Sequence, residues 1–299
     1  MTAPSGRARP EDQIAAIGVA ADRIARVVAE GHDVVITHGN GPQVGNLLVK
    51  NEIAASVVPP VPLDWCGAQT QGTIGFVLLN ALERSLAEIG AARPVGAVVT
   101  RTLVDAGDPA FTRPTKPIGR YLPRDEARVM IEHGQTWQDR GDRGWRRVVA
   151  SPEPRAVLDA PAIAAMLRAG FVVVGAGGGG VPVVRAEDGT LHGVEAVIDK
   201  DLAAAVLGRT LDVDLLVIAT DVDHVALGFG TPAEQPLHRV GVGELRKYEE
   251  EGQFASGSMG PKVEAACRFV ETGGARTVIT SLKRISDAVA GTAGTIVEP

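Results

Sequence analysis

The chain has 299 residues, of which 45% are hydrophobic, enough for a substantial core in one large domain or in two lobes around a cleft. Its formal net charge of −6 argues against a nucleic-acid-binding surface, which usually carries a basic excess. The N-terminus lacks the apolar region of a secretory signal, and the longest uncharged apolar stretch, 171–184, is too short and glycine-rich to span a bilayer. Cys66 and Cys267 fit buried free thiols. We therefore expect a soluble, cytoplasmic protein.

Helical and strand patterns alternate along most of the chain. Residues 11–30 carry an apolar stripe at helical spacing, the apolar run 33–37 indicates a buried strand, and Pro42 opens another helix. The same alternation predicts strands over 95–101, 171–175, 215–220 and 277–280, and helices over 73–89, 160–169, 200–208 and 262–272. Strands that alternate with helices predict an α/β fold whose mostly parallel sheet is covered by helices on both faces.

Residues 107–155 interrupt this alternation, because they are rich in Pro, Arg, Asp and Trp. The composition favours an insertion that projects from the sheet as a lid. A long surface loop is the alternative.

Three glycine-rich turns are candidate anion sites. Residues 38–42 form a strand end, a glycine turn and a helix start, where open N–H groups and the helix dipole favour an anion. Residues 175–180 match G-x-G-x-x-G, but an extended segment with Pro182 follows instead of a helix, so we expect a phosphate cradle or a plain turn rather than a Rossmann site. Residues 256–260 suit a loop over a phosphate tail, with a structural turn as the alternative.

Lysines accompany these turns, namely Lys116 in Pro-Thr-Lys-Pro, Lys200 in Ile-Asp-Lys-Asp and Lys262 in Gly-Pro-Lys. Lysine ammoniums neutralise phosphate charge, and glycine turns let N–H groups approach an anion, so the combination predicts phosphoryl transfer. Asp221 and Asp223 follow a predicted strand and could serve Mg²⁺, a ribose or backbone caps. The six histidines show no metal spacing, so we expect any catalytic metal to be Mg²⁺ held largely by the nucleotide.

A series of motifs in order along the chain resembles those of carbamate kinases, within the amino-acid kinase family. The motifs are 37–46, 108–111 with 114–119, 144–149 before 151–154, 175–182, 195–201, 220–223 and 257–262. The resemblance implies a three-layer αβα sandwich and reversible, Mg²⁺-dependent phosphoryl transfer between carbamoyl phosphate with ADP and carbamate with ATP. It also implies a cytoplasmic homodimer that serves arginine metabolism.

The resemblance further assigns lobes and site residues. It implies an N-terminal carbamoyl-phosphate-binding lobe over 1–205, with a protruding subdomain at about 107–155, and a C-terminal nucleotide-binding lobe over 206–299. The implied catalytic residues are Lys116, Lys200 and Lys262, which stabilise the moving phosphoryl group, and Asp201, which organises the lysines. The implied substrate-binding residues are His38, Gly39, Asn40, Gly41, Gly177, Gly178 and Gly179. The implied nucleotide-binding residues are Thr220, Asp221, Val222, Asp223, Met259 and Gly260.

One departure from the family concerns its first strand, which normally ends in a Gly-Gly-Asn-Ala turn that contacts phosphate. Residues 1–10 match neither the strand nor the turn, and we expect that this strand is missing and that Met1 is an internal methionine of a longer protein. Two alternative functions therefore stand beside the kinase. One is a non-catalytic nucleotide- or anion-binding protein, and the other is a related small-acid kinase, against which the insertion motifs 114–117 and 145–147 argue.

Overall fold

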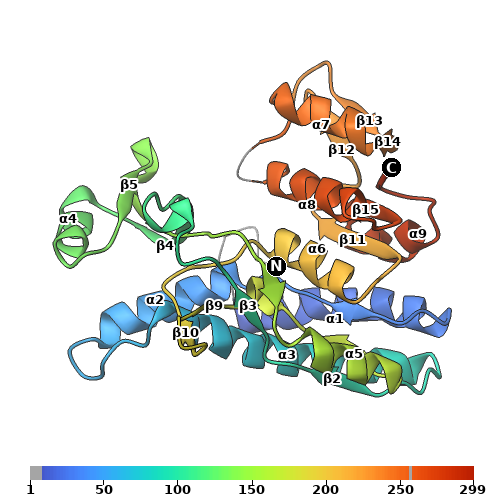
Figure 1. Cartoon of the computed structure of the whole chain (residues 1–299), viewed down its shortest axis with the longest axis horizontal. Helices are drawn as coiled ribbons and strands as arrows, with labels where there is room; N and C mark the ends of the chain where they lie inside the picture. The colour runs from blue at the N-terminus through green and yellow to red at the C-terminus, as the bar shows by residue number, and fades with distance from the viewer. Residues whose placement is uncertain (1–8, 256–257) are drawn as a thin grey trace.

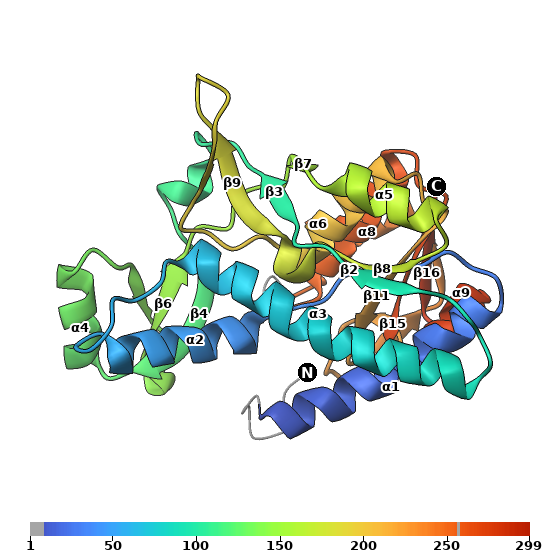
Figure 2. The ribbon, with the colours of Figure 1, turned by 90° about the horizontal axis from the view of Figure 1, so that it is seen from below.

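The computed structural model describes residues 9–255 and 258–299, and it forms a layered αβα body from which a small subdomain projects (Figures 1 and 2). Residues 1–8, on which the expectation of a missing first strand rests, lie outside the described residues. The same holds for Ser256 and Gly257 of the third glycine turn.

The elements alternate along the chain as predicted. The helices are α1 (Pro10–Ala29), α2 (Gly41–Ala54), α3 (Leu63–Glu88), α4 (Arg124–Glu132), α5 (Ala160–Arg168), α6 (Lys200–Thr210), α7 (Val242–Glu250), α8 (Gly260–Glu271) and α9 (Ile285–Val289). The strands are β1 (Val35–Ile36), β2 (Val95–Ala97), β3 (Arg101–Leu103), β4 (Lys116–Leu122), β5 (Trp137–Asp139), β6 (Trp145–Val149), β7 (Ala156–Val157), β8 (Val172–Val174), β9 (Val181–Arg185), β10 (Leu191–Gly193), β11 (Leu215–Thr220), β12 (Val225–Leu227), β13 (Gln235–Leu237), β14 (Arg239–Gly241), β15 (Arg276–Ser281) and β16 (Thr295–Glu298).

Two predicted boundaries differ from the structure. The helix expected from Thr73 begins earlier, at Leu63, because its first turn buries Leu63 and Cys66 in a separate apolar cluster. The strand expected over 95–101 is two strands, β2 and β3, which belong to different sheets. The ladder ends between them because the Thr100 N–H donates to the side chain of Gln71 instead of to a neighbouring strand.

The N-terminal sheet is buried on both faces, as β8 illustrates. This strand lies between β1 and β2 and is parallel to both. Val172 and Val174 pack with α1 and α3, while Val173 packs with α5 and α6. Since successive side chains of a strand point to opposite faces, this alternation places helices on each side of the sheet, which confirms the predicted αβα layering.

The C-terminal sheet follows the same plan in the order β11-β15-β16-β14. Strand β11 is parallel to β15, which pairs antiparallel with β16. Leu216 and Ile218 face the cluster that includes α6 and α8, and Leu215 and Val217 face α9.

A cavity of about 2600 Å³ separates these two sheets. Its walls include the edges of β1 and β11, Ile17 and Ile24 of α1, and Leu207 of α6. Within the described residues, β1 and β11 each pair with a strand on one side only. The cavity therefore lies between the sheet β1-β8-β2 and the sheet β11-β15-β16-β14, and a further sheet, β10-β9-β3-β7, belongs to the N-terminal part of the chain.

Residues 107–155 contain regular structure that extends away from the layered body (Figure 1). Strands β4, β6 and β5 form an antiparallel sheet in that order, with α4 beside it. Ile118 and Val149 of this sheet pack against Val44 and Leu48 of α2, which fixes the subdomain to the N-terminal lobe.

Two further predictions concern the whole chain. Both cysteines are free and buried, as the sequence predicted. Burial raises the pKa of the Cys267 thiol to about 12, so this thiol stays protonated at neutral pH.

Across the described ranges, every helix is too short or too polar to cross a lipid bilayer.

Candidate active site

Three lysines from distant parts of the chain meet two aspartates at the start of α6. Lys200 Nζ lies 2.6 Å from Asp201 Oδ1, and Lys262 Nζ, from α8, lies 3.0 Å from Asp201 Oδ2. Lys116 Nζ, from β4 of the subdomain, lies 2.9 Å from Asp199 Oδ2. All five residues line the cavity. The structure therefore brings together the four residues expected to be catalytic, and adds Asp199.

The aspartates are placed by the N-terminus of α6. Asp199 is its N-cap, and its Oδ1 accepts the N–H groups of Asp201 at 2.9 Å and Leu202 at 3.3 Å. Asp is favoured at an N-cap because it satisfies orphan N–H groups and complements the helix dipole. Burial alone would raise the pKa of Asp199, but Lys116 and these hydrogen bonds lower it below its ordinary value. Asp199 therefore stays ionised beside Lys116 at neutral pH.

Two of the predicted glycine turns pack directly on each other near the lysines. The Gly178 N–H donates to the His38 carbonyl at 2.7 Å. Gly178 has a φ of +66°, and a Cβ on it would lie 2.1 Å from Asn40 Nδ2. A Cβ on Gly39 would lie 3.3 Å from Cδ of Lys200. Only glycine fits at position 178, whereas a Cβ at position 39 would press on the flexible side chain of Lys200. The first turn therefore presents bare backbone beside a lysine, the arrangement expected of an anion cradle.

Buried polar side chains support both turns from below. Gln71 donates to the carbonyls of Thr100 and Gly177, both at 3.1 Å, and accepts the Thr100 N–H at 2.8 Å. Asn40 Nδ2 donates to Thr70 Oγ1 at 2.9 Å. The side chains of Thr70 and Gln71, both on α3, are buried, so their hydrogen bonds lie in the protein interior and fix the positions of the two turns.

Sequence reasoning missed these supports, and it did not include Asp199 among the expected catalytic residues. The available signal for the first was the polar run Gln69-Thr70-Gln71, which interrupts an otherwise apolar region of α3. Thr102, on β3, is a further support, since its hydroxyl donates to the Gly179 carbonyl at 2.7 Å. Asp199 carried a signal too, because Asp is a preferred N-cap residue directly before a predicted helix.

His38 is a neutral group of the first turn. Burial lowers the pKa of its imidazole below the ordinary value, and the charge of Lys200 acts in the same direction, while a hydrogen bond with the Gly39 carbonyl opposes both. Its Nδ1 lies 3.2 Å from that carbonyl oxygen. An uncharged ring therefore holds the turn in place and leaves the positive charge to the lysines.

The expected nucleotide-binding residues divide into two groups. Thr220, Asp221 and Val222, at the carboxyl end of β11, line the cavity together with Met259. Ligands of open α/β sheets bind at this end of the strands. Asp223 and Gly260 lie outside the cavity lining, Asp223 accepting the Thr280 hydroxyl through its carbonyl at 3.2 Å and Gly260 starting α8.

The expected substrate-binding residues also differ in position. The cavity is lined by His38, Gly39, Asn40, Gly41 and Gly178. Gly177 and Gly179 lie outside its lining, where their carbonyls accept hydrogen bonds from Gln71 and Thr102.

The described residues contain no group of three or more His, Cys, Asp or Glu side chains that could hold a metal ion. Asp199 and Asp201 already bind lysines. This donor set fits an Mg²⁺ ion that arrives on nucleotide phosphates, because Mg²⁺ is often bound mainly by phosphates and water. Ammonium groups and backbone N–H groups without a covalent nucleophile suit in-line phosphoryl transfer, which depends on positioning and charge.

The chain matches the amino acid kinase family over residues 6–281. It is 47% identical over 289 residues to carbamate kinase from Thermococcus kodakarensis, which covers 95% of this chain and 91% of the relative. It is 45% identical over 290 residues to the carbamate kinase-like protein YahI from Escherichia coli, covering 95% of this chain and 91% of that protein.

Solved structures agree with this match. Carbamate kinase from Giardia lamblia bound to AMP-PNP superposes with a TM-score of 0.94 at 37% identity, covering 100% of this chain and 95% of that one. An N-acetylglutamate synthase from Neisseria gonorrhoeae, at 17% identity and a TM-score of 0.57, shares the fold alone. The chain belongs to the amino acid kinase family of phosphotransferases, in the branch that holds the carbamate kinases.

Proposed function

We propose that this chain is a carbamate kinase, which transfers the phosphoryl group of carbamoyl phosphate to ADP and releases carbamate and ATP, reversibly. The cluster of three lysines and two aspartates between the glycine turns and the end of β11 carries this proposal. Its formal charge is +1, three ammoniums against two carboxylates, so a phosphate anion is attracted. The carbamate kinases among the relatives support the choice of substrate.

The two ends of the site take different ligands. The turn at 38–41 holds carbamoyl phosphate through backbone N–H groups beside Lys200. The turn at 177–179 packs against it and supports it, because the Gly178 and Gly179 N–H groups already donate to the carbonyls of His38 and Ala176. The nucleotide lies against Thr220, Asp221, Val222 and Met259, which line the cavity near the carboxyl end of β11, with Asp223 and Gly260 next to them in the chain. The lobes are then 1–205 and 206–299, with the subdomain at about 107–155 bringing Lys116.

The lysines act on the phosphoryl group as it moves. Lys200 and Lys262 share Asp201, so their ammoniums are held apart from each other and directed by one buried carboxylate. Lys116 approaches from the subdomain. As charge develops on the transferring oxygens, these preorganised donors stabilise it. When bound together with ADP, Mg²⁺ would supply further neutralising charge.

We also propose a cytoplasmic homodimer that serves arginine metabolism. The outer face of α3 exposes Trp65 and Phe76 by 61% and 63%, and Val99 beside it by 59%. Exposed aromatic side chains of this kind favour an interface between copies of the chain. Size-exclusion chromatography with light scattering tests it, since a monomer at micromolar concentration would contradict a stable dimer.

The decisive experiment measures ATP formation by the purified chain given carbamoyl phosphate, ADP and Mg²⁺. We expect turnover, and we expect Lys200→Ala to reduce kcat by about 100-fold or more, the scale of one lost transition-state contact. Lys247→Ala on the exposed surface of α7 is the matched control and keeps full activity. A folded chain that binds ADP by calorimetry without forming ATP would contradict the proposal and favour a non-catalytic binding protein.

A further inference from the structure

Asp199 has a role in this site that neither the lysines nor Asp201 can fill. Its two carboxylate oxygens do different things. Oδ1 accepts the N–H groups of Asp201 and Leu202 at the start of α6, while Oδ2 receives Lys116 at 2.9 Å. The side chain is only 13% exposed. Because Oδ1 is fixed by the helix, Oδ2 has a fixed position from which to hold a lysine.

The position of Lys116 depends on this contact. It stands at the first residue of β4 in the projecting subdomain, and its side chain remains 39% exposed. Among the ion pairs of residues 9–255 and 258–299, Lys116 pairs with Asp199. A long, flexible side chain with that exposure has many rotamers, and a fixed carboxylate reduces their number before the substrate arrives.

The backbone around Asp199 already joins the subdomain to the helix. The Val197 N–H donates to the Ala150 carbonyl at 3.0 Å, and Ala150 forms an isolated parallel bridge with Ala196. Ala150 follows β6, which pairs with β4 at Lys116 through Val149. The segment that leads into Asp199 therefore runs beside the strand pair that carries Lys116, so the carboxylate and the ammonium are brought together by the fold.

We propose that Asp199 is a positioning residue, which holds the Lys116 ammonium at the phosphoryl-transfer site. This inference rests on the proposed carbamate kinase function. An ammonium has three N–H donors, of which Asp199 takes one and leaves two for phosphate oxygens. Asp199 acts through Lys116 in this scheme, whereas Asp201 acts through Lys200 and Lys262. The competing explanation is that Asp199 serves α6 alone, as its N-cap.

Asp199→Asn separates these two explanations. Asn caps a helix about as well as Asp, so α6 and the folded state are kept while Lys116 loses its negatively charged partner. Because a hydrogen bond to a charged group contributes about 1.5–3 kcal/mol, we expect kcat/KM for carbamoyl phosphate to fall by about 10- to 100-fold. The KM for ADP, which the other end of the site binds, should change by less than about twofold.

The same substitution in a Lys116→Met background completes the test. If Asp199 acts through Lys116, the double variant is no slower than Lys116→Met alone, so the two effects are not additive. Glu52→Gln is the matched control. It removes the 3.1 Å ion pair between Glu52 of α2 and Arg120, which lies on β4 as Lys116 does, and this variant should retain full activity.

Two results would overturn the inference. One is an Asp199→Asn variant as active as the wild type, and the other is an equal loss of activity in the Lys116→Met background, which would show that Asp199 acts through α6. Wild-type ATP formation in the same assay is the separate test of the proposed function. A wild-type chain that forms no ATP would contradict the proposed function. An active wild type with an Asp199→Asn variant of equal activity would contradict only the positioning role.

Discussion

Gly178 shows how a single residue determines whether the two glycine turns can pack on each other. Its φ of +66° lies in the left-handed region, and the space where a Cβ would go is filled by the amide of Asn40. Asn40 in turn is held by Thr70 from below. A side chain at this position would therefore cost backbone strain and would also push Asn40 out of the first turn.

Gly178→Ala tests this arrangement, with Gly189→Ala as its control. Gly189 has a φ of +87° with nothing within 4 Å of its Cβ position, and it lies in an exposed turn. Both substitutions should cost about 1–2 kcal/mol of stability from the left-handed backbone. Only Gly178→Ala should also reduce kcat/KM for carbamoyl phosphate, by about tenfold or more, since a small displacement of a positioning group is costly. Urea unfolding and the ATP assay measure the two effects, and equal activity in both variants would contradict the cradle.

The same scale explains which site residues could be predicted. Lys116, Lys200 and Lys262 stand in distinctive local sequences, and their convergence was implied by the resemblance to a family. Gln71 and Thr102 could not be assigned from their sequence neighbours, because their partners are carbonyls of turns far along the chain. A buried side-chain-to-backbone bond depends on the tertiary fold, and local sequence carries little information about it.

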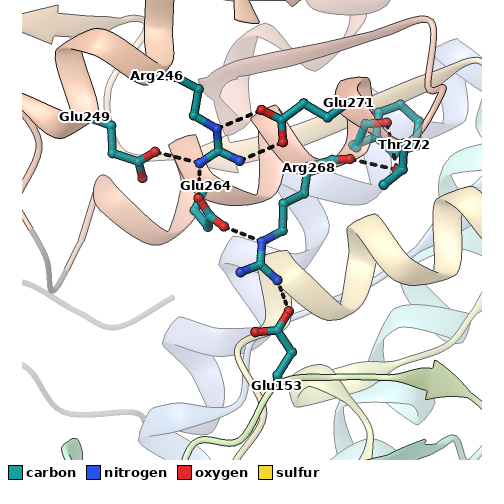
Figure 3. A network of polar contacts seen from close by, with 8 residues as sticks. Glu153, Arg246, Glu249, Glu264, Arg268, Glu271 and Thr272 are labelled. Atoms are coloured by element: carbon teal, nitrogen blue, oxygen red, sulfur yellow. Dashed lines mark hydrogen bonds and ion pairs between the residues drawn. The ribbon is translucent and has the colours of Figure 1, made fainter. Parts of the chain in front are cut away.

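At the scale of elements, an ion-pair network joins α7, α8 and the N-terminal lobe. Figure 3 shows Arg246 of α7 surrounded by Glu249, Glu264 and Glu271. Arg268 of α8 then binds both Glu264 and Glu153, and Glu153 follows strand β6 in the N-terminal lobe (Figure 3). Helix α8 also carries Lys262, so the network holds the helix that bears one of the three lysines of the candidate site.

Arg246→Met measures the contribution of this network to stability. It leaves three carboxylates close together with Arg268 as the remaining cation, so we expect the free energy of unfolding to fall by about 1–3 kcal/mol. Arg128→Met is the control, because Arg128 pairs with Glu132 on the exposed surface of α4 and such pairs contribute about 0.5 kcal/mol or less. Urea midpoints at low and high salt provide the measurement. Equal losses in the two variants would mean that the network contributes no more than a surface pair.

Most elements were predictable because their apolar periodicity is local. The run Leu215–Thr220 was predicted as a strand and is β11, and the stripe over 11–30 became α1. The end of β2 and the start of β3 were not predictable, since a hydrogen bond from Thr100 to α3 divides them. The subdomain sheet was also missed in detail, because its short strands are stabilised by packing on α2.

At the scale of the whole molecule, α6 packs against both sheets, and therefore against both proposed lobes. Ala205 packs in the cluster of the C-terminal sheet with α8, whereas Leu207 packs with Val173 and Ile163 of the N-terminal lobe. The two sheets themselves are separated by the cavity. Cooperativity between the lobes therefore depends strongly on α6 and on the ion pairs that Lys262 and Arg268 make across the same region.

This arrangement predicts a single unfolding transition for both lobes. The tryptophans, at positions 65, 137 and 145, all precede α6, so their fluorescence reports on the N-terminal lobe, while far-UV circular dichroism reports on both lobes. Leu207→Ala should lower the free energy of unfolding by about 2–4 kcal/mol and shift both signals together. We place ADP with Mg²⁺ on the C-terminal lobe. At 100 times its Kd, it should raise the free energy of unfolding by about 2.7 kcal/mol and shift the midpoints of both signals equally. The coupling through α6 is contradicted if ADP leaves the fluorescence midpoint unchanged while the unfolding curve measured by circular dichroism separates into two transitions.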